Sequence, residues 1–371
     1  MKDILNVGVV GAGAISGIYL ENMTNMFSNI RPVAVCAAHM ESAKAKAEKF
    51  GIEACTFSEM LERKDVDIVV DLTPVSEHYR IIKEALLAGK HVYTEKTIAE
   101  TVFQAKELCE IADSKGLYLG SAPDTFLGSA IQSARKVIDD GIIGDINSFS
   151  ISINRKNDLL ANLFPFLRLP GSGVLRDYEV YYITALVSLL GPASRTCAFV
   201  RAPYTERLNE IPNTKNYGEI VPTPNESIVS AIIELENGII GTVHQNHETN
   251  KSDRADFAIY GRKGILMLGN PNYFGGTIRV LQDIPNLFTD IDPEPVVTTV
   301  SPANIYSGNS RGLGVSEMAD AIIHGRKNRA SKEQALHVLD ILESIEKSSG
   351  TGTMVSIESS CEKPEPFVSP V

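Results

Sequence analysis

A glycine-rich turn between an apolar run and an amphipathic segment is the feature that most constrains this chain. Residues 5–10 form a short apolar run, Gly11-Ala12-Gly13-Ala14-Ile15-Ser16 follows, and Ile18, Tyr19 and Met23 then recur at helical spacing. In a strand–turn–helix unit the first glycine allows the tight turn, and the second lets the backbone approach a pyrophosphate on the helix N-terminus. We therefore expect a dinucleotide site. Its expected contacts are Gly11, Gly13, Ala14, Ile15 and Ser16.

The rest of residues 1–122 continues this alternation. Strand-like runs cover 33–37, 67–72, 91–93 and 117–119, and helical patterns cover 41–50, 76–88 and 100–114. Strands separated by helices of this length predict βαβ units, and hence a parallel sheet covered on both faces. The prediction is an α/β, doubly wound Rossmann domain over residues 1–122.

Residues 123–371 follow a different pattern, in which strands succeed one another with few helices between them. Strands are expected at 146–153, 227–236, 239–247, 255–260 and 265–268, and helices at 130–139, 175–190, 314–324 and 332–348. Asn237-Gly238 is a strong hairpin signal, whereas the Pro-, Asn- and Thr-rich stretch 203–224 is expected to be a long loop. This predicts a separate α+β domain with a mostly antiparallel sheet over residues 123–371.

Composition excludes several classes of protein. The 371 residues carry 35 basic and 46 acidic side chains, a net charge of -11, which argues against nucleic acid as a partner. No apolar run approaches the roughly 20 residues that span a bilayer, and the N-terminus lacks a signal-peptide pattern. The five cysteines are scattered without a C-x-x-C pair. We expect a cytoplasmic protein with no membrane partner and no metal site.

The residues at the end of the second predicted strand do not decide between NAD and NADP. The acid that usually binds the adenosine ribose is absent from Cys36-Ala37-Ala38-His39, and so is an arginine for a 2′-phosphate. NAD and NADP are both compatible, with NAD slightly preferred. Ala37 and His39 are expected near the ribose, although His39 as a solvated loop residue is equally compatible with the pattern.

Six motifs along essentially the whole chain resemble the glucose–fructose oxidoreductase/inositol dehydrogenase/MocA family. They are Gly11–Ser16, Leu72-Thr73-Pro74 with His78, Gly89-Lys90-His91-Val92-Tyr93-Thr94-Glu95-Lys96, Ala122–Phe126, Gly171–Asp177 and Asn309–Gly314. The resemblance implies an NAD(P)-dependent oxidoreductase that acts on a sugar or cyclitol hydroxyl. It also implies that residues 123–371 are a substrate-binding domain with a large, open sheet, through which a homo-oligomer forms. It also places further residues beside the cofactor, namely Thr73, Pro74, His78, Glu95 and Lys96.

Three positions depart from the family pattern. The usual Glu-Lys-Pro is Glu95-Lys96-Thr97, which is expected to loosen that turn. The usual base histidine, four residues after Asp177, is Tyr181, and the intervening glycine is Glu179. The identity of the base therefore has to be argued from the residues.

Asp177 and Tyr181 are four positions apart and share one face of a helix. A tyrosine, with a reference pKa of about 10, is a poor base unless a nearby cation lowers that pKa. By the family resemblance Lys96 lies beside the nicotinamide and supplies that cation. The predicted catalytic residues are Lys96 and Tyr181 as a proton-handling pair, with Asp177 binding a hydroxyl or orienting the pair. Alternatively, Lys96 is itself the acid/base.

Four further residues are candidates for substrate binding: Asp124, His247, Asn309 and Arg311. Asp124 follows the last Rossmann strand, where ligands collect, but it is equally suited to cap a helix. His244 and His247 are three apart on a predicted strand and therefore face opposite sides, which argues against a shared metal.

These observations predict hydride transfer between a nicotinamide cofactor and a ring hydroxyl of a sugar or glycoside. The preferred substrate position is C3 of a pyranoside, giving a 3-keto sugar, with a nucleotide that stays bound and is recycled. Two alternatives stay open at this point: a reductase of a non-sugar carbonyl compound, and a catalytically inactive NAD(P)-binding sensor or scaffold.

Overall fold

The chain forms two compact units. The computed structural model describes residues 3–156, 172–249, 254–282 and 296–367. The first unit combines Met1–Leu127 with Asn309–Leu339, and the second combines Gly128–Gly308 with Asp340–Val371. Residues 309–339 thus pack with the first unit. The predicted division at residue 122 into a dinucleotide-binding and a substrate-binding domain remains a proposal.

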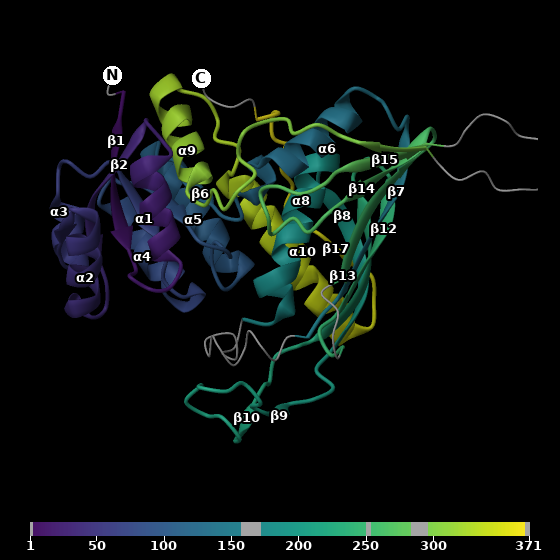
Figure 1. Ribbon diagram of the computed structural model, residues 1–371, viewed down its shortest axis with the longest axis horizontal. Coiled ribbons are helices and arrows are strands. Elements are labelled where there is room, and N and C mark those ends of the chain that lie inside the picture. The colour runs from purple at the N-terminus through teal and green to yellow at the C-terminus, as the bar shows by residue number, and fades with distance from the viewer. Residues whose placement is uncertain (1–2, 157–171, 250–253, 283–295, 368–371) are drawn as a thin grey trace, which may run out of the picture. The chain divides into compact units, whose positions relative to one another are not determined.

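The first unit is a Rossmann fold, as predicted (Figure 1). Its six strands are all parallel and lie in the order β3-β2-β1-β4-β5-β6. Valine and isoleucine fill the central strands and are buried on both sides, which is typical of a parallel sheet. The strands are β1 (Leu5–Val10), β2 (Ile30–Cys36), β3 (Glu53–Ala54), β4 (Ile68–Asp71), β5 (His91–Thr94) and β6 (Leu119–Ser121).

Local signals set the ends of the crossover helices. Two of the helices end at glycines in the left-handed conformation, Gly51 with φ +65° and Gly116 with φ +63°. A capping box of Thr56 and Glu59 starts the short helix that the sequence analysis missed. The helices are α1 (Ser16–Asn25), α2 (Met40–Phe50), α3 (Phe57–Glu62), α4 (Val75–Leu87) and α5 (Val102–Lys115).

Residues 309–339 complete the first unit with α9 (Leu313–His324) and the start of α10 (Lys332–Thr351). The Asn22 side chain in α1 donates to the carbonyl oxygens of Asn309 (2.8 Å) and Arg311 (2.9 Å). Gly312 follows with φ +98° and starts α9. A segment nearly 290 residues away in the sequence is therefore hydrogen-bonded to the first helix.

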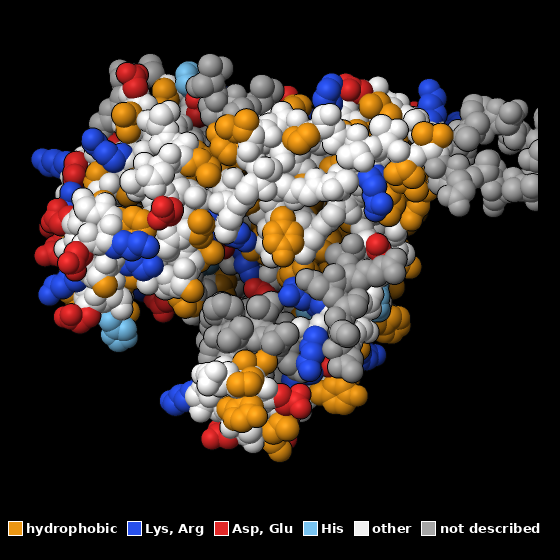
Figure 2. All heavy atoms as spheres, in the orientation of Figure 1, with side chains coloured by type: hydrophobic (Ala, Val, Ile, Leu, Met, Phe, Trp, Pro, Cys, Tyr) orange, Lys and Arg blue, Asp and Glu red, His pale blue; other side chains and the backbone are white. Residues whose placement is uncertain are grey.

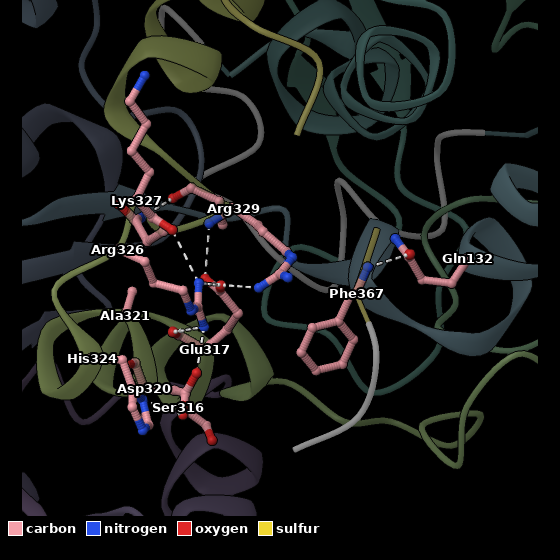
Figure 3. A network of polar contacts seen from close by, with 12 residues as sticks. Gln132, Ser316, Glu317, Asp320, Ala321, His324, Arg326, Lys327, Arg329 and Phe367 are labelled. Atoms are coloured by element: carbon pink, nitrogen blue, oxygen red, sulfur yellow. Dashed lines mark hydrogen bonds and ion pairs between the residues drawn. The ribbon is translucent and has the colours of Figure 1, made fainter. Parts of the chain in front are cut away.

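A buried network of ion pairs joins Glu317 in α9 to two arginines that follow this helix (Figure 3). The Glu317 side chain is fully buried, and its Oε1 pairs with the guanidinium groups of Arg326 (2.5 Å) and Arg329 (2.8 Å). Its Oε2 accepts the backbone N–H of Arg329 at 2.9 Å. Arg326 also pairs with Asp320 at 2.5 Å. Because each carboxylate oxygen is satisfied, the buried charge is compensated.

The second unit contains a nine-stranded sheet in the order β16-β15-β14-β13-β7-β12-β11-β8-β17. Only the β7–β12 pair is parallel among these described strands, which confirms the prediction of a mostly antiparallel sheet. The predicted hairpin turns at Gly238, whose φ is +85°. The strands are β7 (Ile146–Asn154), β8 (Ala193–Arg201), β11 (Ile228–Leu235), β12 (Ile240–Asn246), β13 (Arg254–Gly261), β14 (Gly264–Leu268), β15 (Arg279–Gln282), β16 (Val296–Thr299) and β17 (Val355–Ser356).

The two faces of this sheet differ. Helices α6 (Ser129–Asp139) and α8 (Val180–Leu190) lie on one side of it (Figure 1). On β12, Val243 and Gln245 are buried, whereas alternate residues are not. The opposite face exposes Phe199 (65%) and Ile232 (53%). We call this second surface the open face.

The stretch 203–224, expected to be a loop, contains a two-stranded antiparallel sheet. Strands β9 (Glu206–Leu208) and β10 (Ile220–Pro222) pair with each other. Each of these strands has only three residues and lies among prolines and asparagines, so neither shows a recognisable alternation of polar and apolar residues. Exposed hydrophobic side chains lie on the segment that contains β9 and β10 (Figure 2), among them Tyr217 and Ile220.

Across the described residues, no helix is both long and apolar enough to span a bilayer.

Candidate active site

The glycine turn has the geometry that a pyrophosphate requires. Gly11 has φ +106°, and a Cβ there would lie 2.8 Å from the Leu72 carbonyl oxygen, so only glycine fits. A Cβ at Gly13 would meet nothing within 4 Å, which leaves open space beside the backbone. Helix α1 begins at Ser16 with no side-chain cap at Ile15 and no acid in its first turn. This helix N-terminus therefore fits an anionic ligand.

Ser16 completes the turn, and Ala37 and His39 follow the neighbouring strand β2. Ser16 is fully buried, and its hydroxyl donates to the Gly13 carbonyl oxygen at 2.7 Å, so it fits where a third small residue is expected. At the end of β2, Ala37 is half-buried and His39 is exposed, without a side-chain bond that caps α2. Contact of Ala37 and His39 with the nucleotide stays a prediction.

The loop after β4 is tied to the turn after β5. Asp71 accepts the backbone N–H (3.0 Å) and the hydroxyl (2.7 Å) of Thr73, and burial raises the Asp71 pKa. Pro74 then starts α4. The His78 ring lies between the carbonyl oxygens of Thr73 (2.9 Å) and Thr97 (2.7 Å). His78 thus holds together the two loops in which cofactor contacts are predicted.

Lys96 lies directly after β5, on a turn with several hydrogen bonds. Glu95 accepts the Tyr19 hydroxyl at 2.8 Å through Oε1 and the Lys96 backbone N–H at 3.2 Å through Oε2. Thr97 is buried, and its hydroxyl donates to the Ala99 carbonyl oxygen at 2.8 Å. The hydroxyl and the carbonyl oxygen of Thr97 thus both make hydrogen bonds, and the expectation that Thr97 loosens this turn stays a prediction.

Asp124 acts as a cap in this structure, but at the predicted helix near residue 314 rather than at the segment that directly follows it. Its Oδ2 accepts the backbone N–H groups of Gly312 (3.2 Å) and Gly314 (2.9 Å), at the start of α9. Burial raises the Asp124 pKa to about 6, against the effect of these bonds and of Arg311. Arg311 donates to the Asn309 side chain at 2.9 Å. Substrate contacts from Asp124, Asn309 and Arg311 stay predictions.

In the second unit, Asp177 and Tyr181 lie at the junction of two kinds of helix. Residues Leu175–Glu179 form a π-helical turn that continues directly into α8. Asp177 is half-buried and Tyr181 is buried. The turn starts against Glu226, whose Oε1 accepts the Leu175 N–H at 3.1 Å. The helix predicted over 175–190 thus begins with a wider, π-helical turn. In the motif Gly171–Asp177, Gly171 lies outside the residues that the structure describes.

Glu179 has a partner that sequence reasoning missed. Its side chain is fully buried, and its Oε2 accepts from Gln245 Nε2 on β12 at 2.5 Å. Burial raises the Glu179 pKa to about 8, and the Gln245 bond only partly opposes this effect. The one signal of a buried partner in the sequence was that Glu179 stands where the family pattern has a glycine.

His247 lies on the helix-covered side, next to Tyr178. The two rings meet edge to face at 5.5 Å, and the Arg155 guanidinium lies 4.1 Å from the Tyr178 ring centre. Burial, with a smaller contribution from Arg155, lowers the His247 pKa to about 3, so the ring is neutral at neutral pH. His244 instead bonds to Ser230 Oγ at 2.8 Å on the open face. Substrate contact by His247 stays a prediction.

The predicted catalytic residues are divided between the units. Lys96 belongs to the first unit, together with all the predicted cofactor contacts, and Asp177 and Tyr181 belong to the second. The structure describes the surroundings of each residue within its own unit. Their joint action is therefore a proposal.

Comparison with known proteins identifies the chain. Residues 5–122 match the family model described as "Oxidoreductase family, NAD-binding Rossmann fold", and residues 131–267 match the "GFO/IDH/MocA C-terminal domain". An NAD-binding Rossmann unit followed by an open-sheet unit defines an NAD-dependent oxidoreductase. The chain belongs to the GFO/IDH/MocA family, whose relatives include sugar dehydrogenases, as the sequence motifs predicted.

The relatives include several sugar enzymes. D-glucoside 3-dehydrogenase of Escherichia coli K12 is 25% identical over 95% of this chain and 97% of its own length. A dTDP-3,4-didehydro-2,6-dideoxy-alpha-D-glucose 3-reductase of Streptomyces violaceoruber is 33% identical, over 52% of this chain and 56% of the reductase. A solved levoglucosan dehydrogenase, in complex with NADH and L-sorbose, matches with a TM-score of 0.81 at 22% identity. That match covers 96% of this chain and 99% of the dehydrogenase, and it supports the fold.

Proposed function

We propose that this protein transfers hydride between a nicotinamide cofactor and a ring hydroxyl of a sugar or glycoside. The preferred position is C3 of a pyranoside, which gives a 3-keto sugar. Two relatives support this position, because a glucoside 3-dehydrogenase aligns over nearly the whole chain and a sugar 3-reductase aligns over half of it.

The observation that carries the proposal is the placement of Lys96 relative to the glycine turn. Gly11 follows β1 and Lys96 follows β5, and both strands belong to one parallel sheet with β4 between them. The carboxyl ends of parallel strands lie at the same edge, where ligands bind in open α/β sheets. A lysine at this edge is suited to proton transfer beside a bound nucleotide.

Each proposed catalytic residue has a distinct role. When bound, the nicotinamide supplies the acceptor or the donor of the hydride. Lys96 lowers the pKa of the Tyr181 phenol, and Tyr181 takes the proton from the reacting hydroxyl. Asp177 binds a neighbouring hydroxyl or orients this pair. Alternatively, Lys96 takes the proton itself, and Tyr181 only orients it.

The first test identifies the nucleotide. The purified protein is denatured, and any released nucleotide is identified by mass spectrometry. Stoichiometric NAD or NADP is expected if the cofactor stays bound between turnovers, and pairs of sugars then serve as substrate and oxidant. An empty protein is instead titrated with NADH and NADPH. Failure to bind either nucleotide would overturn the proposal.

The second test identifies the substrate class. A panel of glucosides, free sugars, cyclitols and non-sugar ketones is assayed for cofactor oxidation or reduction, and products are located by NMR. A 3-keto product supports the proposal. Turnover of non-sugar carbonyls alone would replace it with a reductase, and nucleotide binding without any turnover would indicate a sensor.

A further inference from the structure

The Glu179–Gln245 pair leaves two buried oxygens without donors. Gln245 Nε2 donates to Glu179 Oε2 at 2.5 Å, and both side chains are fully buried. In the part of the chain that the structure describes, Glu179 Oε1 and Gln245 Oε1 have no hydrogen-bond partner. An unsatisfied buried acceptor destabilises the fold, and an uncompensated buried carboxylate does so more strongly. The arrangement therefore requires an additional hydrogen-bond donor.

The surroundings of Glu179 do not compensate a negative charge. Gln245 on β12 is neutral, and Glu226, in the segment before β11, adds a second acidic group. His247, directly after β12, is uncharged near neutral pH because its pKa is lowered to about 3. Arg176, on the same turn as Glu179, pairs with Glu346 at 2.5 Å. A proton is therefore the simplest donor that can satisfy both oxygens.

We propose that Glu179 is a neutral carboxylic acid at neutral pH, paired with Gln245 as an acid and an amide. Its Oε1–H donates to Gln245 Oε1, while Gln245 Nε2–H donates to Glu179 Oε2. The pair fastens the π-helical turn Leu175–Glu179 to β12. Glu179 is thus a positioning residue for Asp177 and Tyr181, a role that rests on the proposed function.

The pair gives stability a specific pH dependence. An unfolded glutamate titrates near 4.3, whereas folding raises the Glu179 pKa to about 8. The folded state therefore binds more protons between these two values, and stability falls as pH rises through this window. The stabilising contribution is fully present below about pH 4 and is lost above about pH 8.

The experiment uses the full chain and three proteins: wild type, Glu179→Gln and Glu234→Gln. Glu179→Gln keeps the shape and an amide donor but cannot ionise. Glu234 is partly exposed on β11 and pairs with Arg195, so its variant is a matched control. Thermal unfolding is followed from pH 5 to pH 8.5. Relative to Glu179→Gln, the wild type and the control are expected to lose several degrees of Tm as the pH rises.

Infrared spectroscopy tests the proposal on the wild type alone, so this test does not depend on whether the Glu179→Gln variant folds. The C=O stretching band of a protonated carboxylic acid is expected at pH 7, with loss of the band on titration near pH 8. An equal pH slope in Glu179→Gln, or absence of the acid band at pH 7, would overturn the proposal. Neither measurement uses a substrate, so failure of the sugar assay and failure of this inference are distinguishable.

Discussion

The family resemblance led us to expect a histidine at position 181, and the phenol of Tyr181 handles protons differently from an imidazole. A neutral imidazole accepts a proton near neutral pH, whereas a phenol must first lose one, at a reference pKa of about 10. Tyr181 is buried, which opposes ionisation unless a cation is close. The proposed base therefore depends on Lys96.

Replacing each member of this pair tests the assignment. Lys96→Ala is expected to abolish turnover while leaving nucleotide binding largely intact, because the glycine turn is unchanged. Tyr181→Phe is expected to lower kcat by 10²–10⁴, which is typical of removing a general acid or base. Tyr182→Phe, at the adjacent buried tyrosine, is the control. A near-normal kcat in Tyr181→Phe would assign proton transfer to Lys96.

The two glycines of the turn are expected to respond differently to alanine. Gly11→Ala forces a Cβ to 2.8 Å from a backbone carbonyl oxygen at φ +106°, so it lowers both stability and nucleotide affinity. Gly13→Ala meets no protein atom within 4 Å, so its Tm is expected to stay within about a degree of wild type. Its methyl group projects beside the backbone that approaches the pyrophosphate, and affinity should fall at least tenfold. Equal affinity of Gly13→Ala and wild type, measured by titration calorimetry, would place the pyrophosphate elsewhere.

Among the elements, those with a local signal were predictable from the sequence. The glycine turn, the βαβ alternation and the Asn237-Gly238 hairpin depend on residues close together in the chain. The strands missed in the second unit include β15 and β16, of four residues each, and β17, of two. Runs of two to four residues carry too few alternating positions to be recognised, whereas the nine-residue β8 was missed although its residues alternate in burial.

Site features that depend on distant partners were not predictable. Gln245 lies 66 positions from Glu179, and Asp124 caps a helix about 190 positions away. A π-helical turn also has the composition of an ordinary helix, so Leu175–Glu179 looked like the start of α8. Residue types in a motif were therefore readable from the sequence, whereas their partners required the structure.

The end of α9 depends on the buried carboxylate of Glu317. Glu317→Gln leaves Arg326 and Arg329 without their shared counter-charge, and breaking a buried pair costs about 3–5 kcal/mol. The variant should show a clear loss of stability in urea unfolding. Asp320→Asn is the matched control, because Asp320 also pairs with Arg326 but is 29% exposed. Its expected cost is below about 1 kcal/mol, and equal losses in the two variants would contradict the assigned role of burial.

For the whole molecule, the open face is the expected site of self-association. Phe199 and Ile232 are more than half exposed on adjacent strands of the nine-stranded sheet, on the side opposite α6 and α8. Exposed apolar clusters on a sheet commonly mark protein interfaces. We propose that two or more copies of the chain associate through this surface.

Charged substitutions test the interface. Phe199→Glu combined with Ile232→Arg is expected to shift the protein to monomers in analytical ultracentrifugation, because the interface would have to bury two charges. Phe103→Glu is the control, since Phe103 is 78% exposed on α5 in the first unit. An unchanged sedimentation coefficient in the double variant would exclude the open face. Monomeric wild-type protein would exclude the association itself.

The return of residues 309–339 to the Rossmann unit has a consequence for synthesis on the ribosome. Residues 1–122 emerge early, but the segment that bonds to Asn22 and is capped by Asp124 is made about 200 residues later. At 5–20 residues per second, that interval lasts roughly 10–40 s. During it, the nascent nucleotide-binding unit lacks α9, and the surface that α9 covers is open to chaperones. Translation speed through the second unit thus determines how long the first unit waits for completion.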